Sequence, residues 1–433
     1  MTRFILADLR RLWAGSLVVV LLIAFATALG VAVTLQERAL RLGSARAADR
    51  FDLVIGAPGS ETQLLLSSVF LQPSPLPLMS GDVLGKLVAD PRVSWAAPVG
   101  FGDSFSGYPI VGTSTALTAN LSAMSEGRVF ATAGEAVIGA AVTLPLGYEV
   151  KPTHGLAALG GETHTELAYR ITGRLAPTGT SWDRAILVPI QSVWSLHGME
   201  ARNHEAEEAH AEKPTGDPAA AVPHDEATHH DDDHSHGEHA AIDPDAPLDE
   251  HWTAATPGLP AILVRPKTIA DAYKLRQDYR GNGTLAVFPG EVLTNLYATL
   301  GDAKRVLSAV AVGAQILVAA AVLMVTVMHI GQRRRQIGAL RAFGAPQSAV
   351  LMIVWLELFI LIALGILSGF AIGYGAAMLL SAMFSGESGI ALPVGFIRAD
   401  LKSIAAIVLF SAILALAPAL LAYRQSPAAA LRA

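Results

Sequence analysis

Four long apolar segments constrain this chain more than any other feature of its sequence. They cover residues 17–35, 306–330, 349–383 and 403–422, and one block, 36–305, separates the first from the other three. Each segment is long enough to cross a hydrocarbon core of ~30 Å, which takes ~20 helical residues. Backbone groups in lipid must be satisfied within the helix itself. We therefore predict four transmembrane helices and one large domain inserted between the first two.

The composition agrees with a membrane protein. Hydrophobic residues make up 52% of the chain and charged residues only 16%, whereas a typical soluble domain contains ~25% charged residues. The sequence has no cysteine, which excludes disulfide bonds and thiolate metal sites.

Basic residues in the short flanking segments set the predicted orientation. Arginines gather in residues 1–16, 331–348 and 423–433, while the loop 384–402 has a much weaker basic signal. Lysine and arginine remain cytoplasmic when the flanking segments are short, so both termini should be cytoplasmic and the block 36–305 should lie outside.

Two features around the first apolar segment leave alternatives open. Arginines at positions 38, 41, 46 and 50 follow the segment and oppose the predicted orientation, although long loops translocate largely regardless of charge. The segment also fits a cleavable signal sequence, but its length favours a retained anchor. Residues 1–16 fit either an amphipathic helix in the headgroup region or a simple charged flank.

The block 36–305 reads as an α+β domain in two lobes. Short apolar runs bounded by glycine and proline predict strands, and these are 51–56, 95–99, 108–111, 135–138, 167–174, 185–189, 261–264 and 284–288. Helices are predicted over 36–49, 63–70, 269–280 and 289–300.

Residues 201–256 break this pattern of strands and helices. Fifteen acidic and only two basic residues lie between positions 202 and 251. A segment so charged and so poor in apolar residues cannot offset its chain entropy by burial, and we predict that it is a disordered insertion.

Histidine is concentrated in the same insertion, because nine of the thirteen histidines lie within residues 204–251. Imidazole and carboxylate groups are ligands of first-row metals, and zinc accepts them in tetrahedral geometry. The candidate metal ligands are His224, His229, His230, His234, His236, His239, Asp231, Asp232 and Asp233. Zinc is the expected ion, and nickel or copper(II) would bind as well. The alternative is a solvated acidic linker whose histidines have no specific role.

The loop 331–348 carries more than a positive charge. Ile337, Leu340 and Phe343 are spaced three apart on one face of a predicted helix. A small amphipathic helix of this kind suits docking into a partner's groove, whereas a plain cytoplasmic loop accounts only for the arginines.

This loop resembles the signature of the MacB/FtsX-like permease family of ABC transporters. In this Arg-rich stretch the residues that match the signature are Ile337, Gly338, Arg341, Ala342, Gly344 and Ala345. The resemblance implies that the ATPase is contacted by Arg333, Arg334, Arg335, Gln336, Ile337, Gly338, Leu340, Arg341, Ala342, Phe343, Gly344 and Ala345. Gln336 stands where the family usually has glutamate. Gly365, Gly369 and Gly373 repeat every four residues and would let another helix approach closely. Glu357, a further match, reads as a structural residue or as a proton relay.

The resemblance implies a multi-pass permease of the bacterial inner membrane, of the mechanotransmission type (type VII), with its large domain in the periplasm. A separate ABC ATPase subunit would bind and hydrolyse ATP, because this chain has no Walker-type phosphate loop. We therefore expect no enzyme activity and no intrinsic cofactor beyond possible zinc. The expected partners are that ATPase, a second permease copy in a homodimer or related heterodimer, and a periplasmic metal carrier or lipoprotein. No nucleic acid is expected.

Two functions fit this interpretation. The first is efflux or extraction of an extracytoplasmic substrate, linked to zinc or other metal homeostasis through the histidine-rich insertion. The second is a non-transporting signalling or scaffold protein of the same fold, which regulates a cell-wall hydrolase or senses metal. The spans contain no ring of acidic or histidine residues that would form an ion path.

Overall fold

The structure is a computed structural model of the 433-residue chain. It describes residues 10, 13–154, 167–199, 242–299, 301, 346–416 and 420, together with a few positions between 305 and 320. The chain forms two compact units. We call the first, Met1–Leu42, Tyr297–Ser385 and Leu392–Ala433, the helical unit, and the second, Gly43–Leu296 and Gly386–Ala391, the sheet unit.

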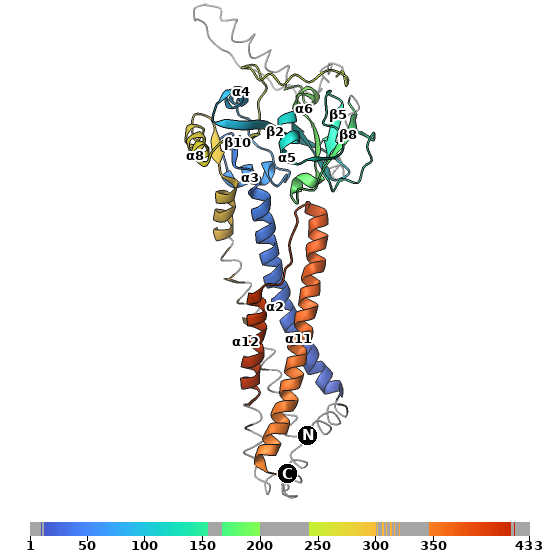
Figure 1. The fold of residues 1–433 in the computed structure, drawn as a ribbon, viewed down its shortest axis with the longest axis vertical. Coiled ribbons are helices and arrows are strands. Elements are labelled where there is room, and N and C mark those ends of the chain that lie inside the picture. The colour runs from blue at the N-terminus through green and yellow to red at the C-terminus, as the bar shows by residue number, and fades with distance from the viewer. Residues whose placement is uncertain are drawn as a thin grey trace, which may run out of the picture. The chain divides into compact units, whose positions relative to one another are not determined.

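Three long helices lie wholly or mostly in the helical unit. They are α2 (Trp13–Ala48), α11 (Gln347–Ser388) and α12 (Arg398–Leu414) (Figure 1). Two of them, over Trp13–Ala48 and Leu351–Ser388, are long and apolar enough to cross a membrane. Their positions match the first and third predicted spans. The second predicted span lies almost entirely outside the described residues, and the number of four transmembrane helices stays a prediction.

The sheet unit is built on an eleven-stranded mixed sheet with the order β11-β1-β10-β2-β3-β9-β5-β8-β4, in which β6 pairs with β8 and β7 pairs with β2. The strands are β1 (Leu53–Gly56), β2 (Val93–Phe105), β3 (Tyr108–Thr113), β4 (Met124–Gly127), β5 (Glu135–Ile138), β6 (Glu149–Val150), β7 (Thr153–His154), β8 (Tyr169–Leu175), β9 (Ile186–Pro189), β10 (Ala261–Pro266) and β11 (Leu285–Val287). The helices are α3 (Glu61–Ser68), α4 (Asp82–Ala89), α5 (Thr115–Leu121), α6 (Ile190–Leu196), α8 (Ile269–Asp278) and the 3₁₀ helix η2 (Ser181–Arg184).

Strand β2 joins two sets of strands. Its first half pairs with β10, where Val99 faces Ala261, and its second half pairs with β3, where Phe105 faces Tyr108. The sequence predicts two lobes. In the structure both strand sets belong to one continuous sheet, because β2 has 13 residues and serves both sets.

The core of the sheet unit lies between the sheet and its covering helices. All four residues of β1 are buried, as are all four of β9, which is typical of strands covered on both faces. The largest fully buried side chains are Trp182 and Tyr169. Leu65 of α3 and Leu84 of α4 are also fully buried.

Residues 242–256 correct the predicted boundary of the insertion. The backbone N–H of Thr115 donates to Oε1 of Glu250 over 2.6 Å at the start of α5. The rings of Trp194 and Trp252 meet edge to face, with centroids 6.2 Å apart. The prediction of disorder over this part is wrong, because the acidic residues and the tryptophan make specific contacts that composition does not reveal.

The last three residues of α11 and the three that follow it, together Gly386–Ala391, also belong to the sheet unit. The backbone N–H of Ala391 donates to the Gly179 carbonyl over 3.0 Å, and Arg184 Nη1 donates to the Gly386 carbonyl over 2.6 Å. The receiving loop is held by the buried carboxylate of Asp183, which accepts from the Gly179 N–H over 2.8 Å. The sheet unit is therefore assembled from two distant parts of the sequence.

Candidate functional site

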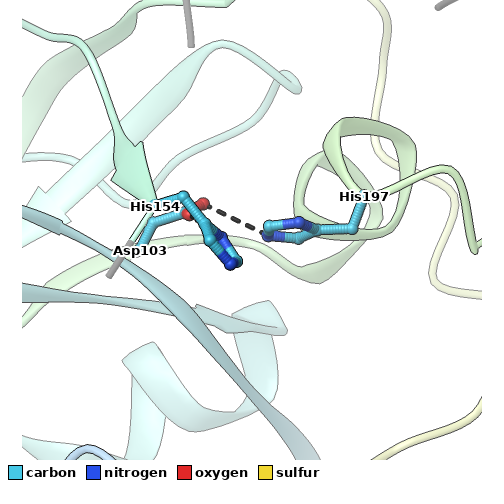
Figure 2. A group of neighbouring side chains, drawn as sticks. All are labelled: Asp103, His154 and His197. Atoms are coloured by element: carbon cyan, nitrogen blue, oxygen red, sulfur yellow. Dashed lines mark ion pairs between the residues drawn. The ribbon is translucent and has the colours of Figure 1, made fainter. Parts of the chain in front are cut away.

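Three polar side chains from separate elements meet in the sheet unit. Asp103 lies in β2, His154 lies in β7, and His197 is the C-cap of α6. One potential ligand atom from each lies within 4.8 Å of those of the other two. Figure 2 shows His197 reaching toward the Asp103 carboxylate from the helix, with His154 beside the same carboxylate.

The local structure explains why these side chains meet. Asp103 and His154 are directly opposite partners in the antiparallel pairing of β2 and β7, and directly opposite residues share one face of a sheet. The end of α6 places His197 over this face, and its backbone N–H bonds to the Val193 carbonyl. A Cβ atom at Gly102 would lie 3.2 Å from Nε2 of His197, so a glycine before Asp103 leaves room for the imidazole.

The distances within the group are equal for the two histidines. Nδ1 of His154 lies 3.4 Å from Oδ1 of Asp103, and Nε2 of His197 lies 3.4 Å from Oδ2. The two rings lie edge to face with centroids 5.3 Å apart. Only 2% of the Asp103 side chain is exposed, against 16% for His197 and 62% for His154. The buried carboxylate therefore lies beside a histidine that is open to solvent.

Tyr169 of β8 lies in the electrostatic field of the same carboxylate. Burial raises the pKa of Tyr169, and the negative charge of Asp103 raises it further. The phenol therefore stays protonated at physiological pH. Within the described part of the chain its buried hydroxyl has no hydrogen-bond partner.

Two imidazoles and one carboxylate form a ligand set that divalent metals of the zinc class accept. The group contains none of the metal ligands predicted from the sequence. Those ligands, between His224 and His239, lie outside the described residues, as do the predicted ATPase contacts between Arg333 and Ala345. Both assignments stay predictions.

The predicted helix-packing glycines lie against α2. A Cβ atom at Gly365 would lie 2.7 Å from Cβ of Ile23, and one at Gly373 would lie 2.6 Å from the Ala28 carbonyl oxygen. A Cβ atom at Gly369 would contact the Ala24 carbonyl oxygen even more closely. Helices α2 and α11 thus approach each other through backbone atoms.

An ion pair between α2 and α12 was not predicted from the sequence. Arg38 donates twice to Asp400, from Nη1 to Oδ2 over 2.9 Å and from Nη2 to Oδ1 over 2.8 Å. Asp400 also accepts from the backbone N–H of Ile397 at the start of α12 over 2.9 Å. This pair gives a reason for an arginine at position 38, where charge statistics alone oppose the predicted orientation.

Comparison with known proteins finds a matching family model and similar solved structures. Residues 308–427 match the family model described as FtsX-like permease C-terminal. The crystal structure of the periplasmic region of MacB from Actinobacillus actinomycetemcomitans matches over 57% of this chain and 95% of that chain, with 10% sequence identity and a TM-score of 0.32. No curated protein sequence matches the chain.

Proposed function

We propose that this chain, whose residues 308–427 match the family model described as FtsX-like permease C-terminal, is the membrane subunit of an ABC transporter. A separate subunit supplies the ATPase. In this proposal ATP binding moves the helical unit, and the helices pass that movement to the sheet unit outside the membrane. The substrate is extracytoplasmic and is exported or extracted. The histidine-rich insertion links this activity to zinc, as a metal-gathering segment.

The observation that carries the proposal is the continuity of α2 and α11 across both units. Helix α2 continues past Leu42, where the helical unit ends, to Ala48 in the sheet unit. Helix α11 continues past Ser385 to Ser388 in the same way. The backbone hydrogen bonds of an α-helix run along its axis and make it a stiff element. An unbroken helix shared by two units is therefore suited to transmit displacement.

The coupling contact is proposed to be the amphipathic run that contains Ile337 and Leu340. Replacing either residue with aspartate would place a charge in an apolar groove of the ATPase. We expect Ile337→Asp and Leu340→Asp each to abolish co-purification of the ATPase while membrane insertion is retained. Affinity purification of the tagged chain from membranes, followed by quantification of the bound ATPase, measures this.

Arg333→Ala is the matched control for the coupling prediction. An exposed charge contributes only ~0–1 kcal/mol to such a contact, so this variant should retain most of the ATPase. Complex formation that is unchanged in both aspartate variants would reject the docking assignment.

Membrane topology can be measured with single cysteines, because the chain contains none. We expect cysteines at Glu126 and Ala220 to react with a membrane-impermeant maleimide in intact cells. Cysteines at Gln332 and Ala433 should react only after permeabilisation. Glu126 is suitable because its side chain is 61% exposed. Protection of the cysteine at Ala220 in intact cells would overturn the topology.

A further inference from the structure

We propose that Asp103, His154 and His197 form an exchangeable binding site for a divalent transition metal of the zinc class in the sheet unit. This goes beyond the proposed function, and it holds whether or not the chain couples to an ATPase. It also differs from the metal binding expected of the histidine-rich insertion, because all three ligands lie on described elements of the folded unit.

The distances between the ligand atoms are the first observation that supports a metal site. Both imidazole nitrogens lie 3.4 Å from the nearest Asp103 oxygen. A charge-assisted N–H···O bond has a length of about 2.7–2.9 Å. Two ligand atoms bound at ~2.0–2.1 Å to one tetrahedral zinc ion are separated by about 3.3–3.4 Å. The spacing therefore fits donors arranged around a shared ion better than donors bonded to each other.

A second histidine–aspartate pair in the same unit provides an internal contrast. Nδ1 of His251 lies 2.6 Å from Oδ1 of Asp249, with side chains that are 93% and 76% exposed. This pair has the short distance of a direct hydrogen bond even though both side chains are exposed to solvent. At Asp103 the carboxylate is almost fully buried, yet both nitrogens keep a longer distance.

The donor set indicates which ion binds. Imidazole nitrogen and carboxylate oxygen together suit zinc and neighbouring divalent transition metals, whereas calcium and magnesium prefer oxygen ligands alone. Three protein ligands leave the fourth tetrahedral position for water or an external donor, as in zinc sites that keep an open position. The buried Tyr169 hydroxyl, which has no partner within the described residues, adds a polar group near the carboxylate.

Exposure indicates that the ion can exchange with solvent. The Asp103 ligand is buried, whereas the His154 side chain is 62% exposed. Removing His154 opens the ion to water without disturbing the core of the sheet. The site joins β2, β7 and the end of α6, so bound metal would tie these elements together.

The test is zinc binding by the purified detergent-solubilised chain, measured as bound metal per chain and by competition with a chelator. Two chains are compared: the full chain, and a chain in which Asn203–Ala240 is replaced by a short Gly/Ser linker to remove the histidine-rich background. We expect the shortened chain to retain one zinc ion. His154→Ala should weaken zinc binding by the shortened chain at least ~10-fold. Even the loss of a group that only hydrogen-bonds to a metal ligand typically lowers metal affinity 10–100-fold. Asp103→Asn and His197→Ala should behave alike.

His251→Ala is the matched control, because it removes an exposed histidine from another carboxylate pair, and it should bind zinc like the parent. Zinc should also raise the unfolding temperature of the parent, because an ion that binds only the folded state stabilises it, and this increase should shrink in His154→Ala. His154 is exposed, so its alanine variant tests the site in the full chain as well, where it should lower the zinc that the chain retains against the competing chelator by up to one ion. Absence of zinc from a folded shortened chain, or parental affinity in His154→Ala, would overturn the proposal.

Discussion

A Gly369→Ile chain should fail to assemble its helical unit, whereas a Gly375→Ile chain should be recovered folded. Both glycines lie in α11. A Cβ atom at Gly369 would lie 2.8 Å from Cα of Ala24 in α2 and even closer to the Ala24 carbonyl oxygen, whereas one at Gly375 would meet nothing within 4 Å. Overpacking costs ~1–3 kcal/mol when side chains can move aside. Here the added side chain meets backbone atoms, which cannot move aside, so the loss of unfolding free energy should lie at the upper end of that range or above it.

Size-exclusion chromatography and thermal unfolding of the detergent-solubilised variants would measure this effect. The Gly375→Ile variant controls for the loss of a glycine from the same helix and for added hydrophobicity. Equal unfolding temperatures for the two variants would show that the close approach of α2 and α11 is not needed for the fold.

Removing one charge from the Arg38–Asp400 pair should destabilise the chain more than removing both. The side chains are only 19% and 11% exposed and bond twice. Removing one partner of a buried pair costs ~3–5 kcal/mol because the other charge is left unpaired, whereas an apolar replacement of both is often neutral. Asp400→Asn keeps an oxygen that can accept from Ile397, so it changes the charge and preserves the helix cap.

A double-mutant cycle with Arg38→Met and Asp400→Asn measures the coupling through unfolding free energies. We expect each single variant to lose roughly 3 kcal/mol and the double variant to recover part of that loss. Lys402→Ala is the control, because Lys402 is an exposed charged residue two positions further along α12. Strictly additive losses would show that the two side chains do not stabilise each other.

The strands that the sequence predicts share one property. All eight are apolar runs bounded by glycine or proline, and each overlaps an observed strand. Three strands were missed. Strands β6 and β7 have two residues each, which is too short for an alternating pattern to emerge. Strand β4 has the sequence MSEG, of which three residues are exposed, so it contains no apolar run. Helices α4, α5 and α6 were also missed. They have eight, seven and seven residues, fewer than the 11–18 residues over which a helical period can be recognised.

The group of Asp103, His154 and His197 was missed because its residues have no sequence signature. Asp103 follows a glycine in a long strand, His154 belongs to a two-residue strand, and His197 ends a short helix. Their separations along the chain follow from β2–β7 pairing and from the position of α6, which spacing rules do not encode. Histidine density drew attention to residues 204–251 instead, although two of the four histidines outside that range form the described group.

The segment Gly386–Ala391, bound to the loop at Gly179 and Arg184, has a consequence for biogenesis. Domains usually fold during synthesis as their own residues emerge, from the N-terminal end onward. The sheet unit cannot do so completely, because this last part consists of the end of α11 and the three residues that follow it, and it is translated long after the rest of the unit. With α11 inserted as a membrane span, as we propose, completion of the sheet unit must therefore wait for that insertion. The order of translation thus makes completion of the sheet unit a late step that reports correct insertion of α11.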